Sequence, residues 1–134
     1  MDLDKLADLI GVRVVETKDL HPSHAGMYIH RRRLILLRAG LDDWNRRSVF
    51  AHELAHAYYH DEKHGDPRIE NRANRWAAQL LITEDDYRSA ELIHGSHPGA
   101  IAHELGVNID VVHTWCDIRI HAGASIPIKY QRES

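Results

Sequence analysis

Hydrophobic spacing in the first 40 residues predicts one short helix and three strands. Residues 3–10 carry apolar side chains at helical spacing, and the β-branched run at residues 12–17 predicts a strand. Two further apolar runs, at residues 26–30 and 33–37, predict a hairpin that turns near residues 31–32 without a turn glycine. The chain is therefore expected to begin with a small antiparallel sheet accompanied by a helix.

Beyond residue 41 the spacing of apolar residues becomes that of helices. Asp42 offers an N-cap for a first long helix, and its expected buried stripe consists of Trp44, Phe50, Leu54 and Tyr58. A second helix begins with Asp66 as N-cap and Pro67 as first residue, and its apolar stripe consists of Ile69, Ala73, Trp76, Ala77, Leu80 and Leu81. Thr83 caps a third helix, which ends near Gly95 and carries Tyr87 and Leu92.

The next segment resembles a DNA-binding helix-turn-helix in the spacing of its Ala, Gly and Val residues, at 102–112. Its would-be recognition helix, residues 109–118, contains Asp110 and Asp117 but no Lys or Arg. Affinity for DNA depends on the neutralisation of phosphates by Lys and Arg, and the net charge of the chain is −3. We therefore interpret the segment as a structural helix pair without direct nucleic-acid binding, with a DNA-binding regulator as the alternative.

Composition indicates a soluble globular protein. A length of 134 residues, 43% hydrophobic and 28% charged, predicts one domain over residues 1–134 with a core of its own. No apolar run approaches the roughly 20 residues of a membrane span, and the charged residues 1–5 do not resemble a secretory signal. A single cysteine, Cys116, excludes an internal disulfide and favours a reducing compartment, so we expect a cytoplasmic location.

The first long helix carries the motif H-E-x-x-H. His52 and His56 are four residues apart and share one helix face, where both imidazoles can bind a single metal ion. Glu53 lies about 100° further round the helix and can reach a water molecule beside that ion. This arrangement is typical of zinc peptidases. The alternative, a surface helix with two incidental histidines, does not explain the glutamate.

A zinc peptidase site needs a third protein ligand. His60 is excluded because it lies about 12 Å along the helix axis from the first histidine. Glu62 follows at the spacing of another known scheme, but the glycine required by that scheme is absent. Glu70 is the preferred ligand because it lies at the edge of an apolar stripe, and Asn74, one turn further, can orient a histidine. An ordinary acidic residue near a helix N-terminus remains the alternative for Glu70.

The H-E-L-A-H run and the later I-E-N-R-A-N-R-W-A-A-Q-L-L-I together resemble the ImmA/IrrE-type metallopeptidases of bacteria, phages and integrative elements. The resemblance covers about residues 26–81, with a weaker tail to about 118. It implies a compact zincin-like α+β fold, with a small N-terminal antiparallel sheet, an active-site helix and C-terminal helices. It assigns His52, His56 and Glu70 to the metal and Glu53 to catalysis. Family members act as anti-repressors that cleave helix-turn-helix repressors, which are therefore the implied protein substrate.

The expected activity is that of a zinc-dependent endopeptidase with one Zn²⁺ per chain, and manganese stays open as an alternative. Glu53 is expected to take a proton from the attacking water. The group that stabilises the oxyanion is not singled out among Tyr87, His94, His97, His103 and His113. The alternative function is a non-catalytic zincin-like protein that binds a repressor without cleaving it. The oligomeric state is not indicated.

The predicted hairpin adds two expectations. One of its strands can pair with an extended substrate beside the active-site helix, with a plain core sheet as the alternative. Its three consecutive arginines, residues 31–33, are interpreted as a solvated turn, with contact to acidic substrate residues as the minority alternative.

Overall fold

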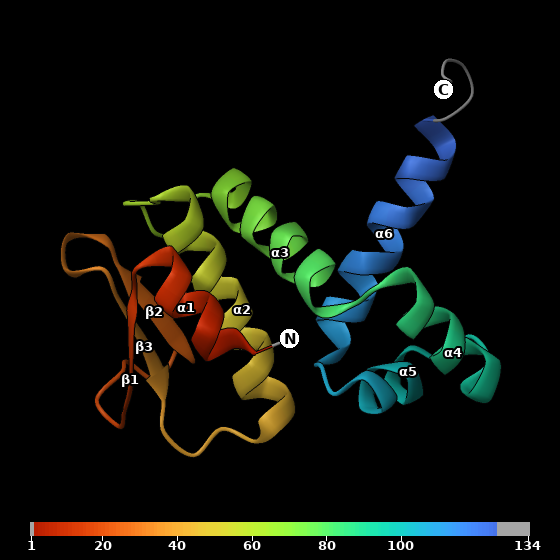
Figure 1. Cartoon of the computed structure of the whole chain (residues 1–134), viewed down its shortest axis with the longest axis horizontal. Helices are drawn as coiled ribbons and strands as arrows, with labels where there is room; N and C mark the ends of the chain where they lie inside the picture. The colour runs from red at the N-terminus through yellow and green to blue at the C-terminus, as the bar shows by residue number, and fades with distance from the viewer. Residues whose placement is uncertain (1, 126–134) are drawn as a thin grey trace.

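The computed structural model describes the backbone of residues 2–125 and the side chains of residues 2–122. A three-stranded sheet near the N-terminus is followed by a series of helices, so the expected α+β class is confirmed (Figure 1). The elements are α1 (Leu3–Ile10), β1 (Arg13–Thr17), β2 (Gly26–Ile29), the 3₁₀ turn η1 (His30–Arg32), β3 (Leu34–Arg38), α2 (Asp43–Tyr59), α3 (Pro67–Leu81), α4 (Glu84–His94), α5 (Pro98–Leu105) and α6 (Ile109–Ser125). No helix in this described part is long and apolar enough to cross a membrane.

The sheet has the order β1-β3-β2 and is mixed. β2 and β3 form the predicted hairpin, with Gly26 opposite Leu37. The expectation of a wholly antiparallel sheet is corrected, because β1 pairs with β3 in parallel. Each strand runs opposite to the one before it in the chain, so β1 and β3 run in the same direction. Because β3 lies between β1 and β2 in the sheet, its pairing with β1 is parallel. β2 is left at an edge of the sheet and packs on α2.

Arg33 corrects the view of the hairpin turn as fully solvated. Its backbone has φ 45°, and its half-buried side chain turns inward. One guanidinium nitrogen, Nη1, donates to the Tyr28 hydroxyl at 2.5 Å and to the Ala57 carbonyl at 3.0 Å, and Nη2 donates to the Ile10 carbonyl at 2.8 Å. Arg33 therefore ties the hairpin to α1 and α2, while residues 31–32 are exposed as expected.

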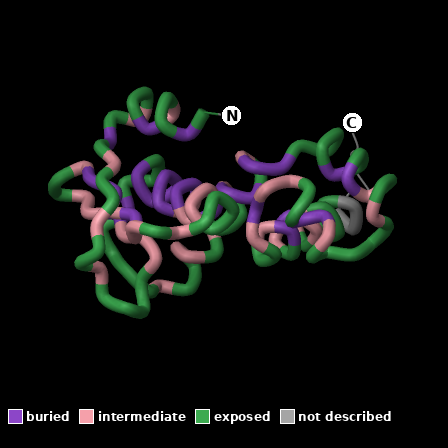
Figure 2. The backbone as a smooth tube through the Cα atoms, turned by 90° about the horizontal axis from the view of Figure 1, so that it is seen from below, coloured by how far each residue is buried: buried purple, intermediate pink, exposed green. Residues whose placement is uncertain are grey.

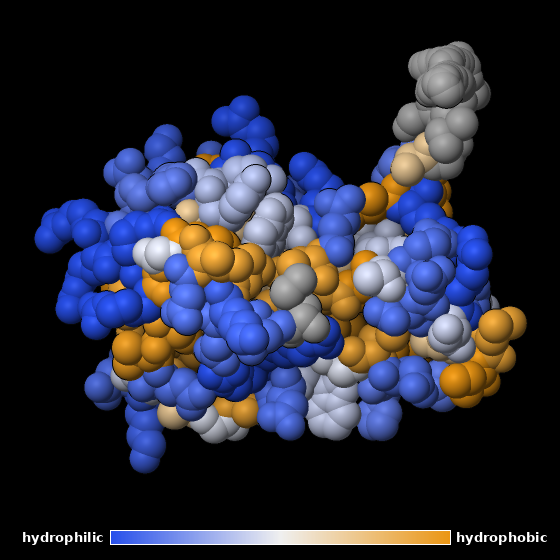
Figure 3. All heavy atoms as spheres, viewed as in Figure 1, coloured by the Kyte–Doolittle hydropathy of each residue, from blue (hydrophilic) through white to orange (hydrophobic). Residues whose placement is uncertain are grey.

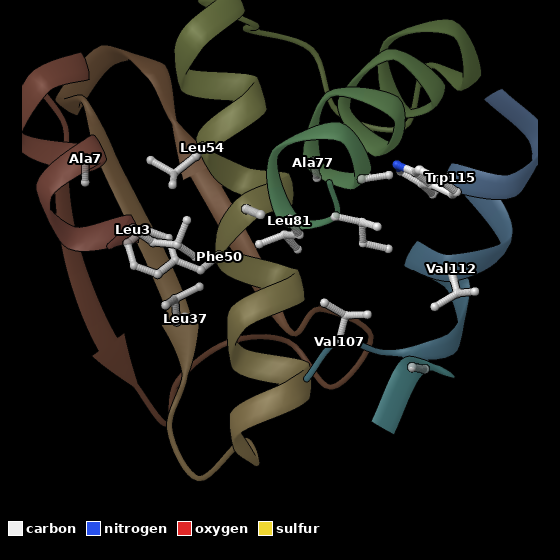
Figure 4. Packing of buried hydrophobic residues seen from close by; sticks show 14 of the residues in the cluster. Leu3, Ala7, Leu37, Phe50, Leu54, Ala77, Leu81, Val107, Val112 and Trp115 are labelled. Atoms are coloured by element: carbon white, nitrogen blue, oxygen red, sulfur yellow. The ribbon is translucent and has the colours of Figure 1, made fainter. Parts of the chain in front are cut away.

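The longest buried run among the described residues, 53–57, lies in α2 (Figure 2). Phe50 and Leu54 of this helix are fully buried in a core that extends from α1 to α6 (Figure 4). The predicted stripe is wrong at its two ends, because Trp44 is 37% and Tyr58 is 53% exposed. Residues four positions apart on a helix differ in direction by about 40°. Tyr58 comes two such steps after Phe50 and therefore points away from the face on which Phe50 lies.

The helices α3 and α4 begin where the sequence predicts. Asp66 caps α3 with Pro67 in its first turn, and Thr83 caps α4 by accepting from the Asp86 N–H. The apolar side chains of α4 divide, because Tyr87 is buried while Leu92 is 87% exposed. Figure 3 shows hydrophobic residues on the surface at the C-terminal end of α4.

The helix-turn-helix-like segment forms the pair α5 and α6, joined at Gly106 with φ 70°. Asn108 starts α6 by accepting from the Val111 N–H through Oδ1 at 3.1 Å. The same turn is held against α2, because the Asn108 N–H donates to Ser48 Oγ at 3.1 Å and Arg47 donates to the Leu105 carbonyl at 2.9 Å. α6 continues to Ser125, beyond the predicted end, and packs along α3.

Candidate metal and catalytic site

The helices α2 and α3 bring His52, His56 and Glu70 together. One ligand atom from each side chain lies within 4.8 Å of the other two. Glu70 Oε1 is 2.9 Å from His52 Nε2 and 3.4 Å from His56 Nε2, and the two Nε2 atoms are 3.1 Å apart. In a tetrahedral site with bonds of about 2.1 Å, ligand atoms lie about 3.4 Å apart. The donor set, two imidazoles and one carboxylate, thus fits a zinc ion in chemistry and in spacing.

The helices α2 and α3 pack against each other, and both carry small buried side chains. Ala51 and Ala55 of α2 and Ala73 and Ala77 of α3 are buried, each at most 3% exposed. Short side chains at a helix crossing reduce the distance between the helix axes. The first turn of α3, which carries Glu70, can therefore reach the histidine face of α2.

Glu53 is buried beside this cluster. Only 8% of the residue is exposed, and burial raises the pKa of its carboxyl to about 7 from 4.5. The negative charge of Glu70 raises this pKa further, whereas His56 and the backbone N–H of Tyr28 oppose the shift. A carboxyl that titrates near neutral pH can both accept and release a proton under ordinary conditions.

The environment of His52 favours a neutral ring. Burial lowers its pKa below 6.5, and the nearby His56 lowers it further, while Glu70 and the side chain of Asn74 act in the opposite direction. A metal ion binds the neutral imidazole through a free lone pair. The site is thus suited to take up a cation without first displacing a proton from His52 at neutral pH.

Asp61 contacts His56 and was missed by the sequence reasoning, which assigned the orienting role to Asn74. Asp61 Oδ2 lies 3.0 Å from His56 Nδ1, and the carboxylate also forms an ion pair with Arg72. Asn74 does line the pocket beside His52, one turn after Glu70. The only signal for Asp61 was an acidic residue just after the end of the motif helix.

The two other candidates for a third ligand lie outside the cluster. Glu62 is exposed in the loop between α2 and α3. His60 ends α2 in a left-handed conformation, with its ring edge-on to His30 at 5.4 Å. The group of three that could hold a metal contains Glu70 instead.

A pocket of about 570 Å³ opens over His52 and Glu53. Its walls come from β2 and the loop before it, from α2 and α3, and from the start of α6. The loop contributes Ser23, His24 and Ala25, β2 contributes Gly26, and the last wall contributes Asn108, Asp110, Val111, His113, Thr114 and Asp117. The helix that resembled a DNA reader therefore forms part of the wall of the candidate active site.

A comparison with protein families decides the affiliation. The family model described as the IrrE N-terminal-like domain, of the M78 peptidases, matches residues 7–114. The chain belongs to this family. The resemblance inferred from the two motifs is thereby confirmed, and it extends over more of the chain than the motifs suggested. No curated protein and no solved structure matches the chain.

Within this M78-family site, His113 is the one of the five oxyanion candidates that lines the pocket. His94 pairs with Glu104 at 2.9 Å, His103 stacks on Trp44, and His97 is an exposed residue at the start of α5. Tyr87 stacks on Trp115 in the core, and its hydroxyl accepts from the Cys116 thiol at 3.3 Å. His24 lines the pocket from the loop before β2, although no sequence pattern singled it out.

Proposed function

We propose that this M78-family protein is a zinc-dependent endopeptidase that hydrolyses peptide bonds. The observation that carries the proposal is the convergence of His52 Nε2, His56 Nε2 and a Glu70 oxygen beside the buried carboxyl of Glu53. The three ligands would hold one Zn²⁺ per chain, and manganese remains the alternative ion.

The chemistry divides between the ion and Glu53. A bound zinc ion would polarise the scissile carbonyl and lower the pKa of the attacking water from about 15.7 toward about 7. Glu53 accepts the proton of that water and passes it to the departing amine, for which its pKa near 7 is well placed. His113, on the α6 wall, is the proposed donor to the developing oxyanion.

The edge strand β2 is the proposed binding site for the substrate backbone. It forms one edge of the sheet, and its first residue, Gly26, lines the pocket next to Glu53. An extended peptide can add to such an edge through main-chain hydrogen bonds. A peptide bound in this way would have its scissile bond next to the Glu53 carboxyl.

We propose that the substrate is a helix-turn-helix repressor, cleaved at a specific bond. The resemblance to ImmA/IrrE-type enzymes supports this, and so does the charge of the cleft. Among the described residues that line the pocket there is no Lys or Arg, whereas Asp110 and Asp117 contribute negative charge. Repressors carry basic DNA-binding surfaces, which an acidic cleft attracts. A repressor substrate also implies a cytoplasmic enzyme.

The proposed catalytic unit is residues 1–134 acting as one metallopeptidase domain. A single hydrophobic cluster includes Leu3 of α1, Phe50 of α2 and Trp115 of α6. The site and its walls thus share one core.

The second candidate function is a protein that binds a repressor without cleaving it. Retention of Glu53 argues against it, since a structural metal site has no use for this buried carboxyl. The deciding experiment incubates the zinc-loaded protein with small helix-turn-helix repressors, beginning with any that is encoded next to its gene, and analyses the products by mass spectrometry. We expect one main cleavage. Stable association without any cleavage would favour the second candidate.

A further inference from the structure

His56 and Glu70 are connected by a second route that does not pass through the metal position. His56 Nδ1 lies 3.0 Å from Asp61 Oδ2, and both side chains are more than nine-tenths buried. Oδ1 of the same carboxylate accepts from Arg72 Nη2. Arg72 follows Glu70 by two residues on α3. The chain His56–Asp61–Arg72 therefore links the two helices that carry the candidate ligands.

The backbone at the end of α2 places Asp61 beside His56. The Asp61 N–H donates to the His56 carbonyl at 2.9 Å, and the His60 N–H donates to the Ala57 carbonyl at 3.2 Å. This pair of bonds is a Schellman motif, which requires the left-handed conformation seen at His60 with φ 57°. The chain reverses there, so Asp61 turns back onto the motif helix. Figure 1 shows the end of α2 and the beginning of α3 at the same end of the helix pair.

The hydrogen-bonding capacities of the three groups determine the position of the ring proton. An arginine only donates and an ionised carboxylate only accepts, so Asp61 accepts from both neighbours. His56 must then carry its proton on Nδ1. Its Nε2 keeps a free lone pair on the side of His52 and Glu70.

We propose that Asp61 and Arg72 are positioning residues that set the tautomer and orientation of His56 for metal binding. Asp61 holds the ring, and Arg72 holds Asp61 from the helix that carries Glu70. The proposal rests on the proposed metal site, but the tautomer of His56 can be measured on the metal-free protein. A failure of this proposal is therefore distinguishable from a failure of the proposed peptidase activity.

Arg72 has an aromatic contact besides its ion pair with Asp61, and within that pair Asp61 is buried while Arg72 is 40% exposed. Its guanidinium lies over the Tyr59 ring, 4.0 Å from the centroid. Its Nε is buried and has no hydrogen-bond partner among the described residues, which costs stability. The pair Arg46–Glu16, at 2.8 Å, also joins two elements but is 34% and 48% exposed. It contributes no residue to the pocket and serves as a matched control.

The decisive variant is Asp61→Asn, which keeps the size of the side chain. Arg72 can only take the amide oxygen, so the amide NH₂ would face His56 Nδ1. His56 then accepts at Nδ1 and carries its proton on Nε2, the nitrogen needed for the metal. We expect zinc affinity, measured by competition with a chelator, to fall by about 10- to 100-fold. Glu16→Gln should leave zinc affinity unchanged.

The double variant Asp61→Asn/Arg72→Ala provides a rescue. Without Arg72 the amide is free to turn its oxygen toward His56, which restores the Nδ1–H tautomer. Zinc affinity should then recover part of what Asp61→Asn lost. A purely structural role for the ion pair predicts the opposite, a further loss in the double variant, and that result would overturn the proposal.

The tautomer is read directly from ¹⁵N NMR of the histidine rings in metal-free protein at about pH 8.5, where an ordinary imidazole is neutral. His56 is assigned by comparison with His56→Gln. Wild-type protein should show His56 protonated on Nδ1, and Asp61→Asn should show it on Nε2. An Nε2–H tautomer in the wild type contradicts the proposal even if every variant fails to fold. Wild-type tautomer and zinc affinity in folded Asp61→Asn contradict it as well.

Discussion

Gly26 of the edge strand β2 lies directly against Glu53 of the motif helix. A methyl group at position 26 would lie 3.1 Å from Glu53 Cγ, 2.6 Å from Val49 Cγ1 and 3.3 Å from the Leu36 carbonyl oxygen. Neither the stiff valine nor the backbone can move far. Because residue 26 has no side chain, β2, which is the proposed binding strand for the substrate, can approach α2, which carries Glu53.

Gly26→Ala is therefore expected to push β2 away from α2 and to displace the Glu53 side chain. Overpacking of this kind typically costs about 1–3 kcal/mol of stability. Peptidase activity should fall while zinc binding persists, because the atoms nearest to a methyl group at position 26 belong to Val49, Glu53 and Leu36 and to none of the three candidate ligands. Urea unfolding and a cleavage assay measure the two effects.

Gly99→Ala is the matched control. Gly99 lies in α5, and a methyl group there would meet no atom within 4 Å. Alanine is the better helix former by up to about 1 kcal/mol, so this variant should keep its activity and gain slightly in stability. If Gly26→Ala kept its activity and stability as Gly99→Ala is expected to do, the close approach of β2 to Glu53 would not matter for catalysis.

The choice of Glu70 as third ligand predicts the outcome of two alanine variants. Wild-type protein should bind one zinc per chain, and Glu70→Ala should bind it much more weakly, because a site with two ligands remains. Glu62→Ala should bind zinc as the wild type does, since Glu62 is exposed in the loop. Chelator competition with metal analysis measures both. A loss in Glu62→Ala with no loss in Glu70→Ala would reverse the assignment.

Glu53→Gln separates metal binding from catalysis. The amide keeps the shape of the side chain but cannot accept the proton, so zinc should remain bound while cleavage slows by about 10²- to 10⁴-fold. The rate of repressor cleavage is measured beside the zinc content of the same samples. Cleavage at the wild-type rate would be incompatible with the proposed role of Glu53.

The raised pKa of Glu53 predicts a pH-dependent stability in the metal-free protein. The folded carboxyl titrates near 7 and the unfolded one near 4.5, so between these values the folded state binds a proton that the unfolded state has released. This contribution is complete below about pH 4.5 and is lost as pH rises through about 7. At 1.36 kcal/mol per pKa unit it amounts to about 3 kcal/mol.

Glu53→Gln has no such titration. Its unfolding free energy relative to wild type should therefore increase by about 3 kcal/mol from pH 4.5 to pH 8. Urea unfolding of both proteins at several pH values tests this. His52 is present in both proteins, so its own titration largely cancels in the difference. Parallel stability curves would show that burial of Glu53 does not perturb its carboxyl.

The sequence predicted the elements that depend on local signals. Caps and helical periodicity located α2, α3 and α4, because Asp42, Asp66 and Thr83 bond to N–H groups two or three residues away. The three residues of the candidate metal cluster were located from spacing along a helix and from the edge of an apolar stripe. Caps and side-chain spacings of this kind involve residues within one or two helical turns of each other, so the local sequence is enough to find them.

Features set by tertiary contacts were not predictable in the same way. The parallel pairing of β1 depends on the insertion of β3, and the inward turn of Arg33 depends on carbonyls contributed by α1 and α2. The role of Asp61 depends on a left-handed residue, His60, where glycine is the usual signal. In each case the partner lies on another element, or behind a turn with no typical residue.

The same distinction governs the helix-turn-helix-like pair α5–α6. Its spacing is that of a DNA-binding helix pair, but Asp110, Thr114 and Asp117 of α6 line the pocket over the candidate metal site. These residues recur every three or four positions and so share one helix face. The start of the helix is fixed in that orientation by the bond from the Asn108 N–H to Ser48 of α2.

We therefore predict that the protein alone does not bind duplex DNA at physiological salt, even the promoter of its own operon. The net charge of −3 repels phosphates on average, and the face of α6 that would enter a groove is acidic and lines the cleft. Electrophoretic mobility shift with that promoter should show no complex, whereas the repressor should shift it and lose the shift after cleavage. Submicromolar binding by this protein that changed in Asp110→Ala or Asn108→Ala would make α6 a DNA reader and would require a second function beside hydrolysis. Without such binding, α6 keeps the role that its contacts indicate, as a wall of the candidate active site.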